Sequence, residues 1–239
     1  MNTNNVSVLQ KESIVNAIYS ITPFTLLDYP DKTACILWFA GCNMRCLYCY
    51  NPDIVLGKGK ISNAQALKFI SSRKGLLDGV VLSGGECTLH KNFIPLITEI
   101  KGMGMLVKID TNGSSPEVLK LLLQNKLVDY VALDFKGTED SFRKITQSDL
   151  FQKFEETFLL LLHSNINFEV RTTVHSDLIN EQDLMWMQNY LEKKGYKGKY
   201  YLQNFVKDVP TLANIQNNKK EITAFQYYPE AKVNVIVRN

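Results

Sequence analysis

Apolar, β-branched runs alternate with amphipathic stretches along most of this chain. A short apolar run predicts a buried strand, and apolar positions spaced three and four residues apart predict a helix that packs on it. The predicted strands are 33–39, 79–82, 106–109, 130–134, 168–173 and 199–202. The predicted helices are 62–73, 94–101, 116–124, 150–163 and 181–194. Two further strands are expected at 17–26, before the first unit, and at 232–237.

This alternation is typical of a parallel sheet with crossover helices. Six such units predict an α/β fold, namely a partial (β/α)6 barrel with its helices outside, an incomplete relative of the eightfold barrel. A chain of 239 residues has room for one such domain. We expect residues 17–239 to form it, with residues 1–16 as an N-terminal extension.

Polar or metal-binding side chains follow every predicted strand, and in such barrels the active site lies at the C-terminal ends of the strands. In chain order these groups are a cysteine-rich loop at 42–49, then Ser83, Gly84, Gly85 and Glu86, then 110–113, then Asp134 and Lys136, then His175, and finally Gln203 and Asn204. The sequence therefore predicts one active site along that edge of the sheet.

The loop at 42–49 carries Cys42, Cys46 and Cys49 at C-x3-C-x2-C spacing. Cysteine thiolates hold iron–sulfur clusters, and a four-iron cluster normally takes four of them. Three thiolates would leave one iron open to a ligand that the protein does not supply, as catalytic metal sites do. A structural zinc knuckle is the alternative, but zinc motifs usually add a second Cys or His pair. The other thiols, Cys35 and Cys87, stand alone, so a second cluster is not expected.

Composition and charge narrow the function further. The chain is 45% apolar and 21% charged with a net charge of +3, which argues against a nucleic-acid or membrane partner. No apolar run approaches about 18 residues, and residues 1–10 lack the pattern of a signal peptide. Five cysteines, three of them in one loop, do not form a secreted disulfide framework. We therefore expect a cytoplasmic protein.

The three-cysteine loop, followed one unit later by Gly84-Gly85-Glu86, resembles the radical S-adenosylmethionine superfamily. The resemblance implies a [4Fe-4S] cluster on the three cysteines and S-adenosyl-L-methionine bound at the open iron. It implies cofactor contacts from Tyr48 to the adenine, from Gly84, Gly85 and Glu86 to the methionine amino group, and from Asp110 and Asn112 to the methionine or ribose. A packing tyrosine and an Asn-Gly turn are the structural alternatives for Tyr48 and for 110–113.

Asp134 and Lys136 resemble the Asp-x-Lys element of glycyl-radical activases and are the expected catalytic pair. Residues two apart on a strand point to the same face, so both can reach the site, although a surface salt bridge is the alternative. Arg171 is expected to face the barrel interior, where it needs an anionic partner such as the cofactor carboxylate. His175 is expected to reach the ribose or the substrate, with an ordinary loop residue as the alternative.

The segment 21–32, together with the cysteine loop, is similar to the activating proteins of anaerobic ribonucleoside-triphosphate reductases, with pyruvate formate-lyase-activating enzymes as cousins. Tyr50 stands where these proteins usually have histidine, and Cys87 where the family usually has proline. The resemblance implies an enzyme that forms a 5′-deoxyadenosyl radical and uses it to install a glycyl radical on a partner enzyme. Flavodoxin or ferredoxin is the implied electron donor. A radical enzyme acting on a small molecule or nucleobase, an activase of a formate-lyase-type enzyme, and a non-catalytic iron–sulfur sensor remain alternatives.

Overall fold

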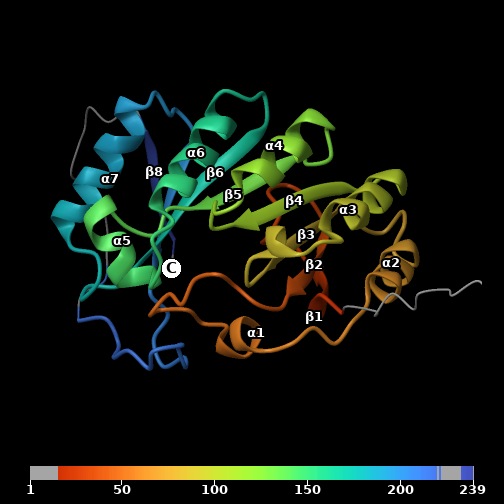
Figure 1. Cartoon of the computed structure of the whole chain (residues 1–239), viewed down its shortest axis with the longest axis horizontal. Helices are drawn as coiled ribbons and strands as arrows, with labels where there is room; N and C mark the ends of the chain where they lie inside the picture. The colour runs from red at the N-terminus through yellow and green to blue at the C-terminus, as the bar shows by residue number, and fades with distance from the viewer. Residues whose placement is uncertain (1–15, 220, 222–232, 239) are drawn as a thin grey trace, which may run out of the picture.

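A computed structural model describes residues 16–219, 221 and 233–238. Its strands form one eight-stranded sheet in chain order (Figure 1). The strands are β1 (Ile18–Thr25), β2 (Ala34–Phe39), β3 (Gly79–Gly84), β4 (Leu106–Thr111), β5 (Tyr130–Asp134), β6 (Asn167–Val174), β7 (Lys199–Asn204) and β8 (Asn234–Arg238). Strand β1 pairs antiparallel with β2, and every other neighbouring pair is parallel.

Helices connect the parallel strands and cover the outer face of the sheet (Figure 1). They are α1 (Pro52–Leu56), α2 (Asn63–Ser71), the 3-10 helix η1 (Cys87–Leu89), α3 (Phe93–Gly102), α4 (Pro116–Gln124), α5 (Glu139–Thr146), α6 (Phe151–Leu162) and α7 (Glu181–Lys193). Helices α2, α5 and α7 are preceded by the N-cap residues Ser62, Thr138 and Asn180, whose side chains accept a backbone N–H of the first turn. Such caps satisfy amides that the helix itself leaves unpaired. Within the described residues no helix is long and apolar enough to cross a membrane.

The predicted α/β partial barrel is confirmed, and the predicted strands and helices all occur. The expected first strand is β1, and the expected last strand is β8, although residue 232 lies outside the described part of the chain. The expected extension, residues 1–16, also lies outside it except for Asn16. Helices α1, η1 and α5 were not predicted, because each is too short to show a clear apolar period.

The two faces of the sheet differ in chemistry. Side chains that point outward, such as Cys35, Leu37 and Phe39 of β2, join the main apolar core beneath the helices. Inside the barrel, Ile36 and Val81 form a smaller apolar cluster near the N-terminal ends of the strands. Nearer the C-terminal ends the inward positions are polar, because alternate residues of each strand share a face. The barrel is thus closed by apolar packing at one end and lined with polar groups at the other.

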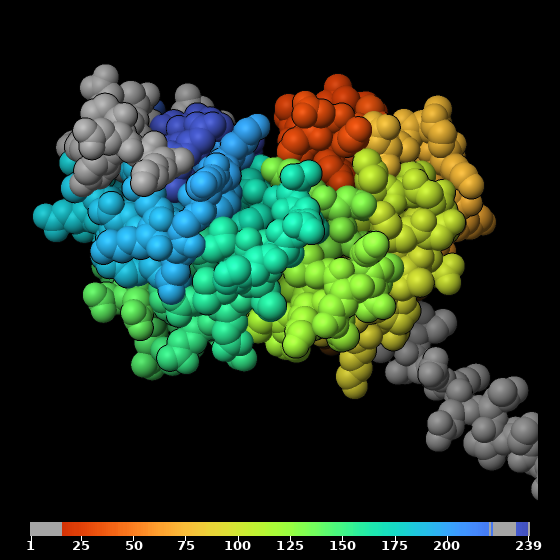
Figure 2. All heavy atoms as spheres, turned by 90° about the horizontal axis from the view of Figure 1, so that it is seen from above, coloured from red at the N-terminus to blue at the C-terminus, as the bar shows by residue number. Residues whose placement is uncertain are grey.

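The sheet does not close on itself, since β1 and β8 are its two edges. In the space-filling view a notch separates the N-terminal strand, coloured red, from the C-terminal segments, coloured blue (Figure 2). The barrel therefore has an open side next to its polar end.

Candidate active site

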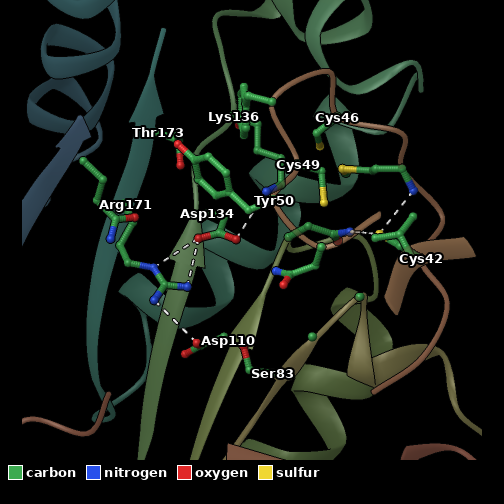
Figure 3. Close-up of a pocket in the computed structure, with 18 of the residues that line it drawn as sticks. Cys42, Cys46, Cys49, Tyr50, Ser83, Asp110, Asp134, Lys136, Arg171 and Thr173 are labelled. Atoms are coloured by element: carbon green, nitrogen blue, oxygen red, sulfur yellow. Dashed lines mark hydrogen bonds and ion pairs between the residues drawn. The ribbon is translucent and has the colours of Figure 1, made fainter. Parts of the chain in front are cut away.

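A cavity of about 400 Å³ lies at the C-terminal edge of the sheet (Figure 3). This volume is in the range of pockets that hold small organic ligands. The residues predicted for the site all line it except Glu86 and His175; the lining ones are Cys42, Cys46, Cys49, Tyr48, Gly84, Gly85, Asp110, Asn112, Asp134, Lys136 and Arg171. The topology therefore brings most of the predicted groups together.

The cysteine loop is supported by backbone hydrogen bonds from a helix that the sequence did not predict. The amide of Arg45 donates to the carbonyl oxygen of Thr146 at 2.8 Å, and the amide of Leu47 donates to that of Ile145 at 3.0 Å. Both carbonyls belong to the last turn of α5, where a helix leaves carbonyl groups without partners. The end of α5 thus fixes the path of the loop beside the cavity.

The three thiols of the loop form no disulfide bond and face the cavity (Figure 3). Burial raises the pKa of Cys46 to about 11, partly opposed by Lys136, and burial also raises the pKa of Cys42. Metal binding at these thiols would have to displace their protons. Among the residues that the structure describes, no three Cys, His, Asp or Glu side chains are grouped as ligands of a single metal ion. A cluster has a different requirement, because each thiolate binds a different iron, and three free thiols around one cavity fit it.

A row of alternating charges forms one wall of the cavity and ends at Lys136, next to the cysteine loop. The guanidinium of Arg171 lies 3.0 Å from the carboxylate of Asp134 and 3.5 Å from that of Asp110. Burial acts to raise the pKa of Asp134, but Lys136 and Arg171 outweigh it and lower the pKa. Burial acts in the same way on Asp110, and Arg171 with Lys108 lowers its pKa. Both carboxylates are therefore ionised at neutral pH.

Lys136 lies 3.3 Å from Asp134, and its side chain is 14% exposed. Burial acts to lower the pKa of Lys136, but Asp134 and the nearby thiols raise it well above its usual value. The ammonium group therefore stays charged next to the cysteine loop. The predicted acid–base pair is present in the cavity wall, and Asp134 is shared with Arg171.

Lys108 is a functional candidate that the sequence analysis missed. Its side chain is 2% exposed and forms an ion pair with Asp110, which also accepts a hydrogen bond from Ser83 at 3.1 Å. The sequence could have revealed it, because Lys108 stands two residues before Asp110 in an otherwise apolar strand. Residues two apart on a strand point to the same face. Three more residues line the cavity and were also missed: Asp28 between β1 and β2, Trp38 of β2 and Arg238 of the edge strand β8.

Gly84 and Gly85 allow two backbone segments to approach closely. Gly84 has a φ of +115°, and a Cβ on Gly85 would lie 1.8 Å from the carbonyl oxygen of Gly41. The amide of Glu86 donates to that same oxygen at 2.9 Å. Only glycine fits here, and the contact fixes the start of the cysteine loop against the end of β3.

Glu86 does not line the cavity, and the contact of its side chain with the cofactor amine stays a prediction. The carboxylate is fully buried and accepts hydrogen bonds from the hydroxyls of Thr88 at 2.6 Å and Thr111 at 2.8 Å, and from the amide of Asn112 at 2.8 Å. Burial raises its pKa, opposed by these hydrogen bonds. Cys87 next to it is also buried and outside the cavity lining, as expected of a small core residue.

His175 is likewise outside the cavity lining, and its contact with ribose or substrate stays a prediction. Its Nε2 lies 2.7 Å from the carbonyl oxygen of Gln216, and its Nδ1 accepts from the amide of Asp177. The ring packs edge-on against Phe205 at 4.7 Å. His175 therefore holds the segment that follows β7, as a loop residue would.

That segment, residues 205–219, passes beside the cysteine loop, and we call it the strap (Figure 1). The amide of Leu212 donates to the carbonyl of Cys49 at 2.9 Å, and the amide of Val206 donates to the hydroxyl of Tyr50 at 2.8 Å. Tyr50 also packs on Phe205. The strap and α5 thus hold the loop from two sides.

Comparison with known proteins bears on the same residues. The family model described as the Radical SAM superfamily matches residues 36–188, which include the cysteine loop and most of the charged wall. The chain belongs to the radical SAM superfamily. Members of this superfamily use a [4Fe-4S] cluster and S-adenosylmethionine, and the three thiols and the cavity of this chain fit that pair of cofactors.

Curated relatives place the chain beside the glycyl-radical enzyme activases. A protein of Methanocaldococcus jannaschii, named provisionally as a glycyl-radical enzyme activating enzyme, is 33% identical over 173 residues, covering 70% of this chain and 72% of that protein. The pyruvate formate-lyase-activating enzyme of Clostridium pasteurianum is 32% identical over 53% of this chain and 55% of that enzyme. The chain is therefore an enzyme of the radical SAM type in the activase family.

Solved structures show the same fold at low sequence identity. SuiB of Streptococcus suis bound to S-adenosylmethionine superposes with a TM-score of 0.63 at 12% identity, over 83% of this chain and 48% of SuiB. The protein anSMEcpe with bound AdoMet superposes with a TM-score of 0.58 at 21% identity, over 70% of this chain and 49% of that protein. These likenesses support the partial barrel.

Proposed function

We propose that this chain installs a glycyl radical on a partner enzyme and that the partner is an anaerobic ribonucleoside-triphosphate reductase. The observation that carries the proposal is that three free thiols and a row of charged side chains line the same cavity, beside the open side of the barrel. When bound there, the cluster and S-adenosylmethionine supply one-electron chemistry that ends in removal of a hydrogen atom.

In this proposal the chain's own residues divide the work of binding. Cys42, Cys46 and Cys49 hold the cluster as thiolates. Lys136 has three N–H donors and uses one of them on Asp134, so it is able to hold a carboxylate in the cavity. Asp134 keeps that ammonium charged and in place.

The chain also limits access to the cavity. The strap and the cysteine loop cover one side, which keeps water away from a reactive site. Toward the open side the cavity is lined by Asp28 and Trp38, from the β1–β2 hairpin, and by Arg238 of β8. The proposed substrate is a loop of the partner that carries a glycine. Because glycine has no side chain, such a loop is well suited to enter the cavity through the open side.

Two partners are compatible with the family. The segment 21–32 resembles reductase activases, which supports the reductase, whereas the named relatives include pyruvate formate-lyase-activating enzymes. We propose flavodoxin or ferredoxin as the electron donor. The cytoplasm is the proposed location, since the five cysteines are free thiols.

The test is an anaerobic activation assay with each partner in turn. Protein reconstituted with iron and sulfide is mixed with S-adenosylmethionine, reductant and either the reductase or a formate lyase from the same organism, and the electron paramagnetic resonance spectrum is recorded. The proposal predicts a glycyl-radical doublet with the reductase. A doublet with the lyase alone would reassign the partner. Formation of 5′-deoxyadenosine without either doublet would favour a small-molecule substrate.

A further inference from the structure

We propose that Asn112 raises the reduction potential of the cluster by a hydrogen bond to the Cys42 thiolate, and that Glu86 positions Asn112 for this role. The inference rests on the proposed assignment of Cys42 as a cluster ligand. It gives both residues a function other than the cofactor contact expected from the sequence.

The orientation of the Asn112 amide follows from its neighbours. Its Oδ1 accepts from the backbone amide of Ser114 at 2.9 Å, and a backbone N–H is only a donor. The NH2 group must therefore point the other way, where Nδ2 lies 3.0 Å from Oδ1 of Asn43 and 3.8 Å from Sγ of Cys42. Both amide hydrogens are thus used within the protein, and one of them is directed at sulfur.

Glu86 fixes the turn from which Asn112 extends. Its Oε2 accepts from the Asn112 amide and its Oε1 from the Thr111 hydroxyl, both at 2.8 Å. Thr111 and Asn112 are 2% and 4% exposed, so no water competes for these bonds. Gly113, with a φ of +76°, completes the turn, and its amide donates to the Thr111 hydroxyl at 3.1 Å. One buried carboxylate therefore holds the donor at a fixed place.

Glu86 is also tied to the cysteine loop through its backbone, because its amide donates to the carbonyl of Gly41. Gly41 directly precedes Cys42. The Cys42 thiol and the Asn112 amide are therefore both held in place by Glu86. Their separation does not depend on the flexibility of a surface loop. This is the property expected of a tuning contact rather than of an incidental one.

Cys42 is the thiol that receives such bonds. Its Sγ accepts from the amide of Met44 at 3.4 Å as well as from Asn112. In the part of the chain that the structure describes, neither Cys46 nor Cys49 accepts a side-chain N–H bond. Donors to a thiolate sulfur withdraw negative charge and favour the reduced, more negative cluster. Asn112 is therefore expected to ease electron entry.

The test is a redox titration of the reconstituted holoenzyme, followed by electron paramagnetic resonance. Asn112→Leu keeps the side-chain size and removes the donor without adding charge. The expected result is a more negative midpoint potential, such that the ratio of reduced to oxidised cluster at a fixed ambient potential falls by roughly threefold or more. Iron content and the Kd for S-adenosylmethionine are expected to stay within about twofold of wild type.

Ser114→Ala is the matched control. It removes the hydroxyl that accepts from Asn43 at 2.8 Å but keeps the backbone amide that orients Asn112, so its potential is expected to equal that of wild type. Glu86→Gln also removes a negative charge near Cys42, which by itself raises the potential, so its positioning role is tested by coupling: the shift caused by Asn112→Leu is expected to be smaller in the Glu86→Gln background than in wild type. If Asn112→Leu does not fold, Asn112→Ala also removes the donor without adding charge, and it is expected to shift the potential in the same negative direction.

An unchanged potential in Asn112→Leu would overturn the inference. If the Kd for S-adenosylmethionine is weakened as well, Asn112 belongs to a cofactor contact instead. Cys42→Ala separates this failure from a failure of the ligand assignment. Full iron content in Cys42→Ala would remove Cys42 from the cluster, whereas loss of iron would leave the ligand assignment standing.

Discussion

Arg171 and Asp134 form a partly buried ion pair across neighbouring strands, with Nη2 of Arg171 3.0 Å and Nε 3.1 Å from Oδ1 of Asp134 (Figure 3). The two side chains are paired residues of β6 and β5 in the sheet register. Asp110 adds a second carboxylate at 3.5 Å from the same guanidinium. Arg171 therefore neutralises two anions that would otherwise repel each other in the cavity wall.

Removing the guanidinium leaves Asp134 with Lys136, and Asp110 with Lys108, as the remaining cationic partners in a partly exposed wall. Arg171→Met is expected to lower the free energy of unfolding by about 1–3 kcal/mol, because the pair is only partly buried and each carboxylate keeps one lysine. Urea denaturation followed by circular dichroism measures it. The matched control is Arg143→Met, since Arg143 is 78% exposed and pairs with Asp149 at 3.4 Å, and its cost is expected to stay below about 1 kcal/mol. Equal losses in the two variants would contradict this account of the wall.

The same carboxylates predict how stability changes in acid. Their pKa values in the folded state lie below the ordinary value of about 3.9, so the folded state binds fewer protons than the unfolded state. Their contribution is fully present above that ordinary value and is lost as the pH falls through the lower folded-state pKa. We expect the urea midpoint of Asp134→Asn to fall less between pH 5 and pH 3 than that of wild type. Parallel pH profiles would show that Asp134 is not held ionised by its neighbours.

Much of the fold was predictable because periodicity is a local property. Strand β5 and helix α4 have the same bounds in the sequence analysis and in the structure. Helix α5 was missed because only a few of its eight residues are apolar, Phe142 and Ile145 among them. Its end contacts the cysteine loop, and such a contact between distant segments cannot be seen in a local pattern. The strap was missed for a related reason, since it has no regular structure and is held by contacts with distant segments.

The site was predictable as far as one strand or loop determines it. The cysteines and the residues at the strand ends were found because the topology brings all strand ends to one edge. The sequence did not predict that Glu86 and His175 lie outside the cavity lining, because the direction of a side chain after a strand depends on its partners. Those partners, Asn112 and Gln216, lie 26 and 41 residues further along the chain. Lys108 resembles a surface lysine until the barrel encloses it.

The contact between Gly85 and Gly41 predicts an effect on cluster assembly. A Cβ at Gly85 would overlap the Gly41 carbonyl, so Gly85→Ala must displace the start of the cysteine loop. We expect it to lower the iron bound per chain after reconstitution to under about half of wild type, with a stability cost of about 1–3 kcal/mol. Gly102→Ala is the control, because nothing lies within 4 Å of its Cβ position, and iron content there should be normal. Full iron binding by Gly85→Ala would show that the loop tolerates the shift.

The hydrogen bond from Val206 to Tyr50 predicts the dynamics of the strap. Tyr50→Phe removes the acceptor and keeps the ring that packs on Phe205, so a cost of about 1 kcal/mol is expected. Hydrogen exchange measured by mass spectrometry should show faster exchange in peptides that cover 205–219, with unchanged exchange in β3 and β4. Tyr190→Phe, which loses a bond to Glu155 on the outer helices, serves as the control and should leave the strap peptides unchanged. Unaltered exchange in Tyr50→Phe would mean that other contacts hold the strap.

The central claim is that Cys42, Cys46 and Cys49 together hold the catalytic cluster. The most direct test compares wild type, Cys46→Ala and Cys35→Ala after anaerobic reconstitution, by iron content, visible absorbance and formation of 5′-deoxyadenosine from S-adenosylmethionine. Cys35 is a fully buried thiol of the outer core and makes a matched control. The account predicts about four irons per chain and cofactor cleavage in wild type and in Cys35→Ala, with both lost in Cys46→Ala. A Cys46→Ala protein that keeps its absorbance and still cleaves the cofactor would contradict it.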